Sequence, residues 1–338
     1  MIKIGIKKFS KIIIKSDNSS WVLDELKKEL EFSLKKKFNF IHQRFLKFFK
    51  NQSIFFINKY DLLKEKKYNN KIGLSLFHFD PSRKSENKKI IKLIKVNNNI
   101  KCVQVTNNKI KNYLIQEGVS KKKIFKIPIG IDIKKFPYCK INKKNLIKKI
   151  KKLNKFLVIG SFQKDGIGWA DGNKPKMIKG PDIFIKIIQK LKKKVPIHVV
   201  LTGPSRGYVI NKLKKMRVSY EYHNLKNYDE LHKYYELLDC YIVSSRYEGG
   251  PRSILESMAS GVPIYSTKVG QAQELIVNGS NGWLYDKKKI DKLTNLICSN
   301  FNNKKSLTKI LKKARNTALD NDHKKHLILW NKFFKNLK

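Results

Sequence analysis

The sequence predicts an α/β protein made of two parallel-sheet domains. Short apolar runs typical of strands alternate with helical patterns along the chain, as in parallel sheets covered by helices. The alternation restarts after a Lys-rich bridge at about 140–155. The chain has 338 residues, 41% of them hydrophobic, which is enough for two ordinary cores. If the domains face a central cleft, the carboxyl ends of both sheets meet there, where such folds bind ligands.

The first half predicts a small nucleotide-type domain. Ser19 or Ser20 can cap its first helix, and Gly118 can end its third. The expected strands are 11–15, 53–57, 72–78, 101–105 and 124–127, and the expected helices are about 20–36, 86–96 and 107–117.

The second half repeats this architecture and ends in a helical tail. The expected strands are 156–160, 197–201, 219–223 and 240–243, the expected helices are 181–192, 208–216 and 228–238, and the tail runs from 290 to 338. We expect an N-terminal domain at 1–145 and a C-terminal domain at 146–320. A helix at 321–338 is expected to pack back toward the first domain. The bridge reads as a hinge or as a Lys-rich amphipathic helix.

The net charge of +49 is extreme, and 68 of the 75 basic residues are Lys. Abundant Asn and Ile accompany the Lys, which indicates AT-rich coding, whereas attraction to anionic lipid or an acidic substrate is the alternative. The 34 residues of 234–267 contain no Lys but two of the seven arginines, Arg246 and Arg252. A polyanion-binding role does not explain this window.

Four scattered cysteines show no metal-ligand spacing and are typical of reduced residues. The N-terminus is interrupted by lysines, unlike a signal peptide. No apolar run approaches the roughly 18 residues of a membrane-spanning helix. We therefore expect a cytoplasmic protein, or one peripheral at the inner face of the membrane.

Two glutamates stand out within the Lys-free window. Glu248 lies in a Gly-Gly-Pro turn, and Glu256 lies eight residues later in a short helix that Pro251 can start and Gly261 can end. The amides of such a helix start attract phosphate. At a rise of about 1.5 Å per residue, Glu256 lies roughly 7–8 Å along the axis from Pro251. A nucleotide sugar fits this spacing in the order sugar, diphosphate, ribose.

This motif resembles the acid–seven residues–acid signature of family 4 retaining glycosyltransferases, or glycosyl transferases group 1. Their GT-B fold has two Rossmann-like domains facing a central cleft. The resemblance implies that the domain expected at 1–145 is the acceptor-side domain and that the one at 146–320 is the nucleotide-sugar donor domain. Further segments are similar to the family over most of the second half, and one lies in the first: 156–160, Lys179-Gly180-Pro181-Asp182, Leu201-Thr202-Gly203-Pro204, 269–274, 278–282 and 126–136.

The resemblance implies a role for each matching residue. It implies that Glu248 contacts the transferred sugar and that Glu256 holds the ribose. Lys179 matches the family's Lys-Gly phosphate motif, and a cation beside a helix start is electrostatically odd without an anion. The other expected donor-binding residues are Gly160, Lys164, Gly203, Arg206, Gly249, Gly250, Pro251, Arg252 and Ser253.

Some positions depart from the family pattern. Where the family has an Arg, this chain has Lys164, followed by an insertion loop (residues 165–178) rich in Gly and polar residues. Arg206 is another candidate for a phosphate contact. His78 ends an apolar strand and looks like the family's N-domain histidine, which reaches the donor's sugar or phosphate across the cleft; the alternative is a structural histidine at a strand end. With Glu248 and Lys179 it is an expected catalytic residue. Residues 16–20 replace the family's Gly-Gly turn near the acceptor.

The resemblance implies a retaining, hexosyltransferase-type glycosyltransferase that uses a nucleotide diphosphate sugar. Its expected context is polysaccharide, lipopolysaccharide or glycolipid assembly, with a saccharide or lipid-linked acceptor and an anionic membrane surface as a compatible partner. We expect no metal, no cofactor beyond the donor substrate and no specific nucleic acid. The alternatives are another GT-B enzyme, such as a nucleotide-sugar epimerase, and a non-enzymatic basic polyanion-binding protein.

Overall fold

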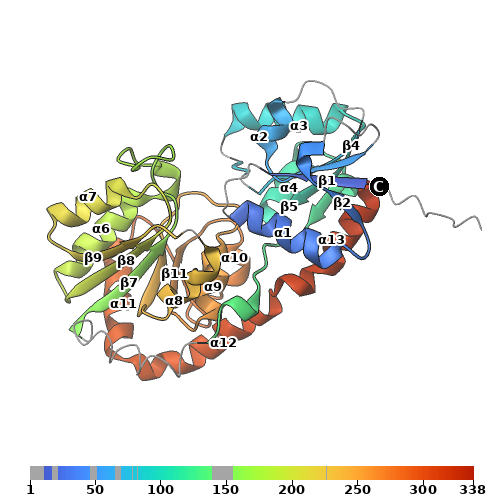
Figure 1. Cartoon of the computed structure of the whole chain (residues 1–338). Helices are drawn as coiled ribbons and strands as arrows, with labels where there is room; N and C mark the ends of the chain where they lie inside the picture. Colours follow the sequence, from blue (N-terminus) through green and yellow to red (C-terminus); the bar gives the residue numbers. More distant parts are fainter. Residues whose placement is uncertain are drawn as a thin grey trace, which may run out of the picture. The chain divides into compact units, whose positions relative to one another are not determined.

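The computed structural model describes residues 11–16, 22–45, 52–64, 70–77, 79–81, 83–138, 155–225 and 227–338. The chain divides into two units, Met1–Pro128 with Lys324–Lys338, and Ile129–His323 (Figure 1). The sequence analysis had placed the boundaries at 145/146 and 320/321, and the first of these lies outside the described residues. The chain therefore leaves the first unit after Pro128 and returns to it in its last helix.

The first unit contains a six-stranded parallel sheet in the order β2-β1-β3-β4-β5-β6. Its strands are β1 (Lys11–Lys15), β2 (Asn39–Ile41), β3 (Ser53–Phe56), β4 (Lys71–Ser75), β5 (Ile100–Val105) and β6 (Ile124–Lys126). Its helices are α1 (Val22–Leu34), α2 (Lys59–Lys64), α3 (Lys84–Val96), α4 (Asn108–Gln116) and α13 (His323–Leu337), with 3-10 turns η1 (Gln43–Phe45) and η2 (Lys121–Lys123).

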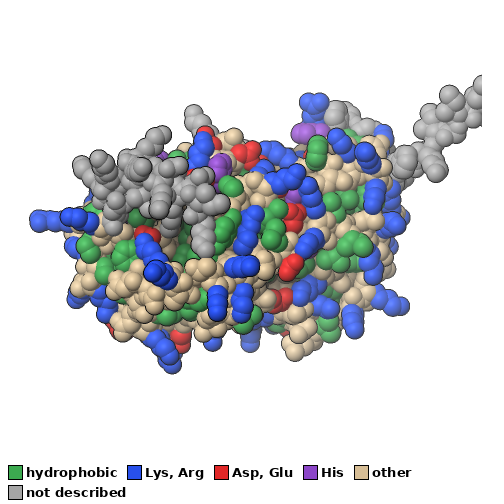
Figure 2. All heavy atoms as spheres, turned by 90° about the horizontal axis from the view of Figure 1, so that it is seen from below, with side chains coloured by type: hydrophobic (Ala, Val, Ile, Leu, Met, Phe, Trp, Pro, Cys, Tyr) green, Lys and Arg blue, Asp and Glu red, His purple; other side chains and the backbone are tan. Residues whose placement is uncertain are grey.

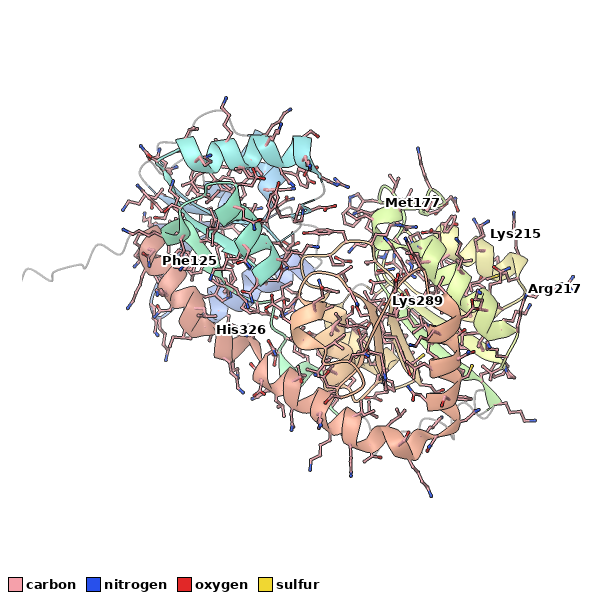
Figure 3. The ribbon with its side chains drawn as sticks, turned by 180° about the vertical axis from the view of Figure 1, so that it is seen from behind. Phe125, Met177, Lys215, Arg217, Lys289 and His326 are labelled. Atoms are coloured by element: carbon pink, nitrogen blue, oxygen red, sulfur yellow. The ribbon has the colours of Figure 1, made fainter. Side chains whose placement is uncertain are left out.

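The C-terminal helix α13 completes the core of this first unit. Trp330, Phe333 and Phe334 are at most 4% exposed. All three rings contact Phe55 of β3, with centroids 5.1–5.6 Å apart. A Cβ on Gly73 of β4 would lie 3.1 Å from Phe333. The absence of a side chain at Gly73 therefore lets α13 pack closely against the sheet. Figure 3 labels Phe125 and His326, which mark the sheet and the start of this helix.

The second unit also has a six-stranded parallel sheet, in the order β12-β11-β10-β7-β8-β9. Counted within the unit, this is the Rossmann order, whose switch point lies between β7 and β10. The strands are β7 (Leu157–Phe162), β8 (Ile197–Thr202), β9 (Ser219–His223), β10 (Cys240–Val243), β11 (Ile264–Thr267) and β12 (Trp283–Tyr285). Two such parallel sheets confirm the predicted fold class.

Helices cover both faces of the second sheet. Helices α6, α7 and α11 pack in one apolar core together with the start of α12, and α8, α9, α10 and the rest of α12 pack in the other. Because both faces are covered, β7, β8, β10 and β11 are buried at every position. The helices are α6 (Pro181–Lys192), α7 (Gly207–Lys215), α8 (Leu231–Tyr235), α9 (Arg252–Ala259), α10 (Ala272–Leu275), α11 (Ile290–Asn302) and α12 (Leu307–Asp320); 3-10 turns are η3 (Ile133–Lys135), η5 (Met177–Lys179), η6 (Tyr228–Glu230) and η7 (Lys304–Ser306).

Most predicted elements are confirmed, with local differences. Helix α6 and strands β9 and β10 have the predicted bounds. Strand β2 and helix α2 were missed, because each is short and flanked by Lys and aromatic residues rather than by clear turn signals. The predicted helix at 228–238 is a 3-10 turn followed by the short helix α8.

Basic side chains are distributed over the surface. Figure 2 shows Lys and Arg scattered among other side chains on the visible face rather than gathered in one patch. Within the described ranges, no helix is long and apolar enough to span a bilayer.

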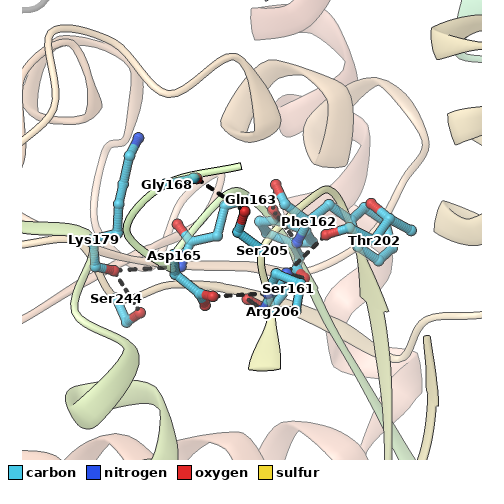
Figure 4. Close-up of polar contacts among 11 residues, drawn as sticks. Ser161, Phe162, Gln163, Asp165, Gly168, Lys179, Thr202, Ser205, Arg206 and Ser244 are labelled. Carbon is cyan, nitrogen blue, oxygen red and sulfur yellow. Dashed lines mark hydrogen bonds and ion pairs between the residues drawn. The ribbon is translucent and has the colours of Figure 1, made fainter. Parts of the chain in front are cut away.

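The insertion loop between β7 and η5 is held together by backbone hydrogen bonds of its own. Gly166 and Pro175 form an antiparallel bridge, and the Lys176 N–H donates to the Asp165 carbonyl at 2.7 Å. The middle of the loop is hydrogen-bonded to the start of α7, since the Gly207 N–H donates to the Asp171 carbonyl at 2.6 Å. Ser205 donates from Oγ to the Gly168 carbonyl at 3.1 Å (Figure 4).

Two glycines of the insertion loop provide a matched test of this packing. Gly172 and Gly168 have φ of 76° and 80°, so Ala at either site meets the same backbone strain, about 1–2 kcal/mol. A Cβ on Gly172 would lie 2.3 Å from the Ser205 backbone, whereas one on Gly168 meets nothing within 4 Å. We expect Gly172→Ala to lower the free energy of unfolding by about 1–3 kcal/mol more than Gly168→Ala in urea titrations. Equal losses would contradict the packing.

Buried tyrosines predict alkaline sensitivity. Burial raises the pKa of Tyr241 to about 12, against about 10 in an unfolded chain. A raised pKa contributes stability that is complete below pH 10 and is lost as the pH rises toward 12. We expect Tyr241→Phe to reduce the loss of unfolding free energy between pH 8 and pH 11 by about 1 kcal/mol. Parallel pH profiles for the two proteins would refute this.

Candidate functional site

The candidate site lies at the switch point of the second sheet. The chain leaves β7 through the insertion loop and enters α6 through the lysine loop (residues 177–180). It leaves β10 and enters α9 through the acid loop (residues 244–251). Parallel strands place both loops at the same sheet edge, together with the starts of two helices. Helix starts at a switch point favour an anionic ligand.

An ion pair joins the two loops. The Lys179 ammonium pairs with Glu248 Oε1, and the Ser245 hydroxyl donates to the same oxygen at 3.0 Å. The Glu248 side chain is 7% exposed and that of Lys179 is 20% exposed. An ammonium has three N–H donors, so Lys179 can keep this pair and also bind a phosphate oxygen. Two residues that the sequence assigned to sugar and diphosphate thus lie together.

Arg246 fixes the same loops to each other. Its guanidinium donates to both Asp182 carboxylate oxygens, at 2.7 and 2.6 Å, and to the Met177 carbonyl at 2.7 Å. The Arg246 backbone N–H donates to the Ile178 carbonyl at 2.8 Å. Hydrogen bonds from Arg246 hold the pKa of Asp182 below its ordinary value. The acid loop therefore cannot move without the lysine loop.

Gly180 allows the loops to approach closely. It is the N-cap of α6 with φ 64°, and a Cβ there would lie 2.0 Å from the Ser244 carbonyl oxygen. Ser244 Oγ and Gln163 Nε2 both donate to the Lys179 carbonyl at 3.3 Å (Figure 4). A larger residue at 180 would separate the two strand exits.

Glu256 lies deeper, within helix α9. It is 3% exposed and accepts hydrogen bonds from the hydroxyls of Tyr228 and Tyr235, the latter at 2.8 Å. Burial first, and then the Glu256 charge, raise the pKa of Tyr235 well above its ordinary value. Tyr235 therefore stays protonated and donates. A carboxylate offers about four lone-pair positions, so two tyrosines do not exhaust its capacity for hydroxyl donors.

The start of α9 packs against residues that follow the domain crossing. Pro251 is the N-cap rather than the first helical residue, a shift of one position. The Arg252 Nε donates to the Gly130 carbonyl at 3.2 Å, and its guanidinium lies 5.5 Å from the Tyr228 ring. A Cβ on Gly250 would lie 2.8 Å from Gln271 Oε1. The glycine turn is thus required by close packing within this unit.

Two donor-binding predictions need correction. Gly160 lies inside β7, two residues before its end, and a Cβ there would lie 2.2 Å from Leu238, so this glycine serves packing. Arg206 is 1% exposed and forms a buried ion pair with Asp165 at 3.0 Å, and it donates to the Ser161 and Thr202 carbonyls. It anchors the insertion loop to β7 and β8 rather than pointing outward (Figure 4).

The remaining predicted residues lie near the strand exits or outside the described residues. Gly203 directly follows β8 with φ 94°. Lys164 Nζ lies 3.3 Å from the centroid of the Trp169 ring, so it is held on the insertion loop. Gly249 and Ser253 flank the start of α9. His78 lies outside the described residues. Among those that are described, no group of three or more His, Cys, Asp or Glu could hold a metal ion.

Several residues of the site were not predicted. The sequence did contain an indication of Arg246, because it is one of seven arginines and lies in the Lys-free window. Nothing in the sequence marks Tyr228, Tyr235 or Ser245, since their roles depend on which side chains pack beside the two glutamates. Gln163 was noted only as part of the departure from the family pattern.

Part of this chain is similar to proteins of a known family. Residues 174–317 match the family model described as glycosyl transferases group 1. An uncharacterized glycosyltransferase of Methanocaldococcus jannaschii is 30% identical over 128 residues, 37% of this chain and 35% of that protein. Protein CapJ of Staphylococcus aureus is 29% identical over 161 residues, 45% of this chain and 38% of that protein. The matched region thus spans less than half the length of either relative.

A solved structure extends the likeness over the whole fold. HepE of Anabaena in complex with UDP-glucose has a TM-score of 0.73, with 15% identity, 97% of this chain covered and 99% of that one. At this identity the likeness shows the fold alone. Residues 174–317, which include the lysine loop, the acid loop and both glutamates, are therefore similar to glycosyl transferases group 1, on a chain with the GT-B fold.

Proposed function

We propose that this protein is a glycosyltransferase that moves a sugar from a nucleotide diphosphate sugar to an acceptor with retention of anomeric configuration. The observation that carries the proposal is the Lys179–Glu248 pair at the switch point, with Glu256 buried in the adjacent helix α9. The match of residues 174–317 to the family model, and the UDP-glucose held by a protein of the same fold, support a nucleotide-sugar donor.

In this proposal, different residues bind the three parts of the donor, which are the sugar, the diphosphate and the ribose. Glu248 contacts hydroxyls of the transferred sugar, because it lies on the acid loop that follows β10 and pairs there with Lys179. Lys179 and the start of α9 bind the diphosphate, whose negative charge grows as the glycosidic bond breaks. Glu256 accepts from the ribose hydroxyls, with Tyr235 holding the carboxylate in place.

The charges also favour the leaving group. The charge of Lys179 is neutralised by Glu248. When the diphosphate departs, it gains the ammonium and the helix-start amides in fixed positions, so little reorganisation is needed. The sugar carbon, left with oxocarbenium character, lies beside the Glu248 carboxylate. The transferred sugar is proposed to be a hexose, and the acceptor a saccharide or a lipid-linked saccharide of polysaccharide, lipopolysaccharide or glycolipid assembly.

A thermal-shift screen of nucleotide sugars tests this function. A bound donor raises the melting temperature by mass action, and the best donor is then incubated with candidate acceptors. Sugar transfer with an unchanged anomeric configuration supports the proposal. Conversion of the donor to another nucleotide sugar without acceptor would identify an epimerase instead. Binding of every polyanion alike, lost in salt, would identify the non-enzymatic alternative.

Lys179→Ala tests the phosphate role. We expect turnover of the screened donor to fall by about 10²–10³-fold, because one preorganised charge at the leaving group is lost. Lys186→Ala is the control, since Lys186 is exposed on helix α6, which follows the lysine loop. A loss below a few-fold for Lys179→Ala, or equal losses in both variants, would refute the role.

A further inference from the structure

Trp169 is exposed to an unusual degree for an indole in a well-packed unit. Its side chain is 64% exposed, and Ile167 and Met177 of the same insertion loop are 52% and 47% exposed. The other described tryptophans, Trp283 and Trp330, are at most 6% exposed. Exposed apolar groups that cluster on one loop mark a contact surface.

The loop that carries Trp169 is firmly anchored. The buried Asp165–Arg206 ion pair fixes the start of the loop, and the hydrogen bond from the Gly207 N–H to the Asp171 carbonyl fixes its middle. Gly172 packs directly on the Ser205 backbone. A side chain held in water by a rigid loop loses less conformational entropy on binding than one on a loose segment.

The ring orientation is also set. Lys164 Nζ lies 3.3 Å from the centroid, on one face of the indole, in a cation–π contact. Since most of the side chain is nevertheless accessible, the accessible area lies on its other face and edges. The indole therefore presents a flat surface backed by a positive charge.

The two ends of the insertion loop adjoin the Lys179–Glu248 pair. The loop begins two residues after Gln163, which donates to the Lys179 carbonyl, and it ends in η5, which contains Lys179. Lys179 in turn pairs with Glu248, the residue assigned to the sugar. Glu256 is held by Tyr228 and Tyr235, from elements that pack on the opposite sheet face to α6 and α7.

From these contacts we propose that Trp169 stacks on the pyranose ring of the bound donor and determines which sugar is accepted, with Lys164 holding the indole in place. This inference rests on the proposed function. Pyranose C–H groups carry partial positive charge and fit the negative face of an indole. A ring with an axial hydroxyl on the stacking face would be excluded, which gives the loop a means of selecting sugars.

Calorimetric titration separates a sugar contact from a nucleotide contact. The probes are the nucleotide sugar selected by the thermal-shift screen and its nucleoside diphosphate. We expect Trp169→Ala to weaken binding of the nucleotide sugar by roughly 3–10-fold and to change binding of the diphosphate by less than about two-fold. Trp169→Phe should recover most of the loss, and Ile167→Ala, an exposed neighbour, should bind as wild type.

Three results would overturn the inference. Equal weakening of both probes by Trp169→Ala would place the indole on the nucleotide, and unchanged affinities would remove it from the donor. Loss of co-sedimentation with phosphatidylglycerol vesicles in both Trp169→Ala and Ile167→Ala, with donor affinity intact, would make the loop a membrane contact. If no nucleotide sugar binds the wild-type protein, the proposed function fails together with this inference, whereas the other results leave that function in place.

Discussion

The site depends on the attachment of the lysine loop to the acid loop. These loops leave the two central strands of the second sheet, where a Rossmann order brings consecutive helix starts to one edge. Arg246 ties them through Asp182, and Gly180 lets them approach to a distance that no side chain would permit. This attachment sets the separation of Lys179 and Glu248, and through α9 it also sets the position of Glu256.

The buried glutamate shows how the unit tolerates a charge in its core. Glu256 lies among Ile254, Leu255 and Met258, which belong to one apolar core. Two tyrosine hydroxyls satisfy part of its hydrogen-bonding capacity, so the carboxylate stays in a fixed place. Tyr235 is fully buried in that core. The core thus provides the rigid base on which a ribose-binding carboxylate can be built.

The spacing of apolar residues, together with Gly and Pro at the ends of elements, predicted the fold well where both were clear in the sequence. Helix α6 has a Gly-Pro start and an apolar stripe, and its bounds were predicted, whereas β2 has three residues and no clear signal. The separate roles of Lys179 and Glu248, 69 residues apart, came from the family resemblance and not from spacing, and their pairing was not predicted. Tyr228 and Arg206 show the limit, because whether a polar side chain points to a ligand or into the protein is decided by packing between distant segments.

A crystal structure of the protein with a nucleoside diphosphate tests the central claim most directly. The account predicts a terminal phosphate oxygen within about 3 Å of Lys179 Nζ, at hydrogen-bond distance, and ribose hydroxyls on the Glu256 carboxylate. It also predicts that Arg246 and Asp182 remain paired in the complex. A diphosphate bound away from the switch point, or glutamates directed away from the ligand, would contradict the account.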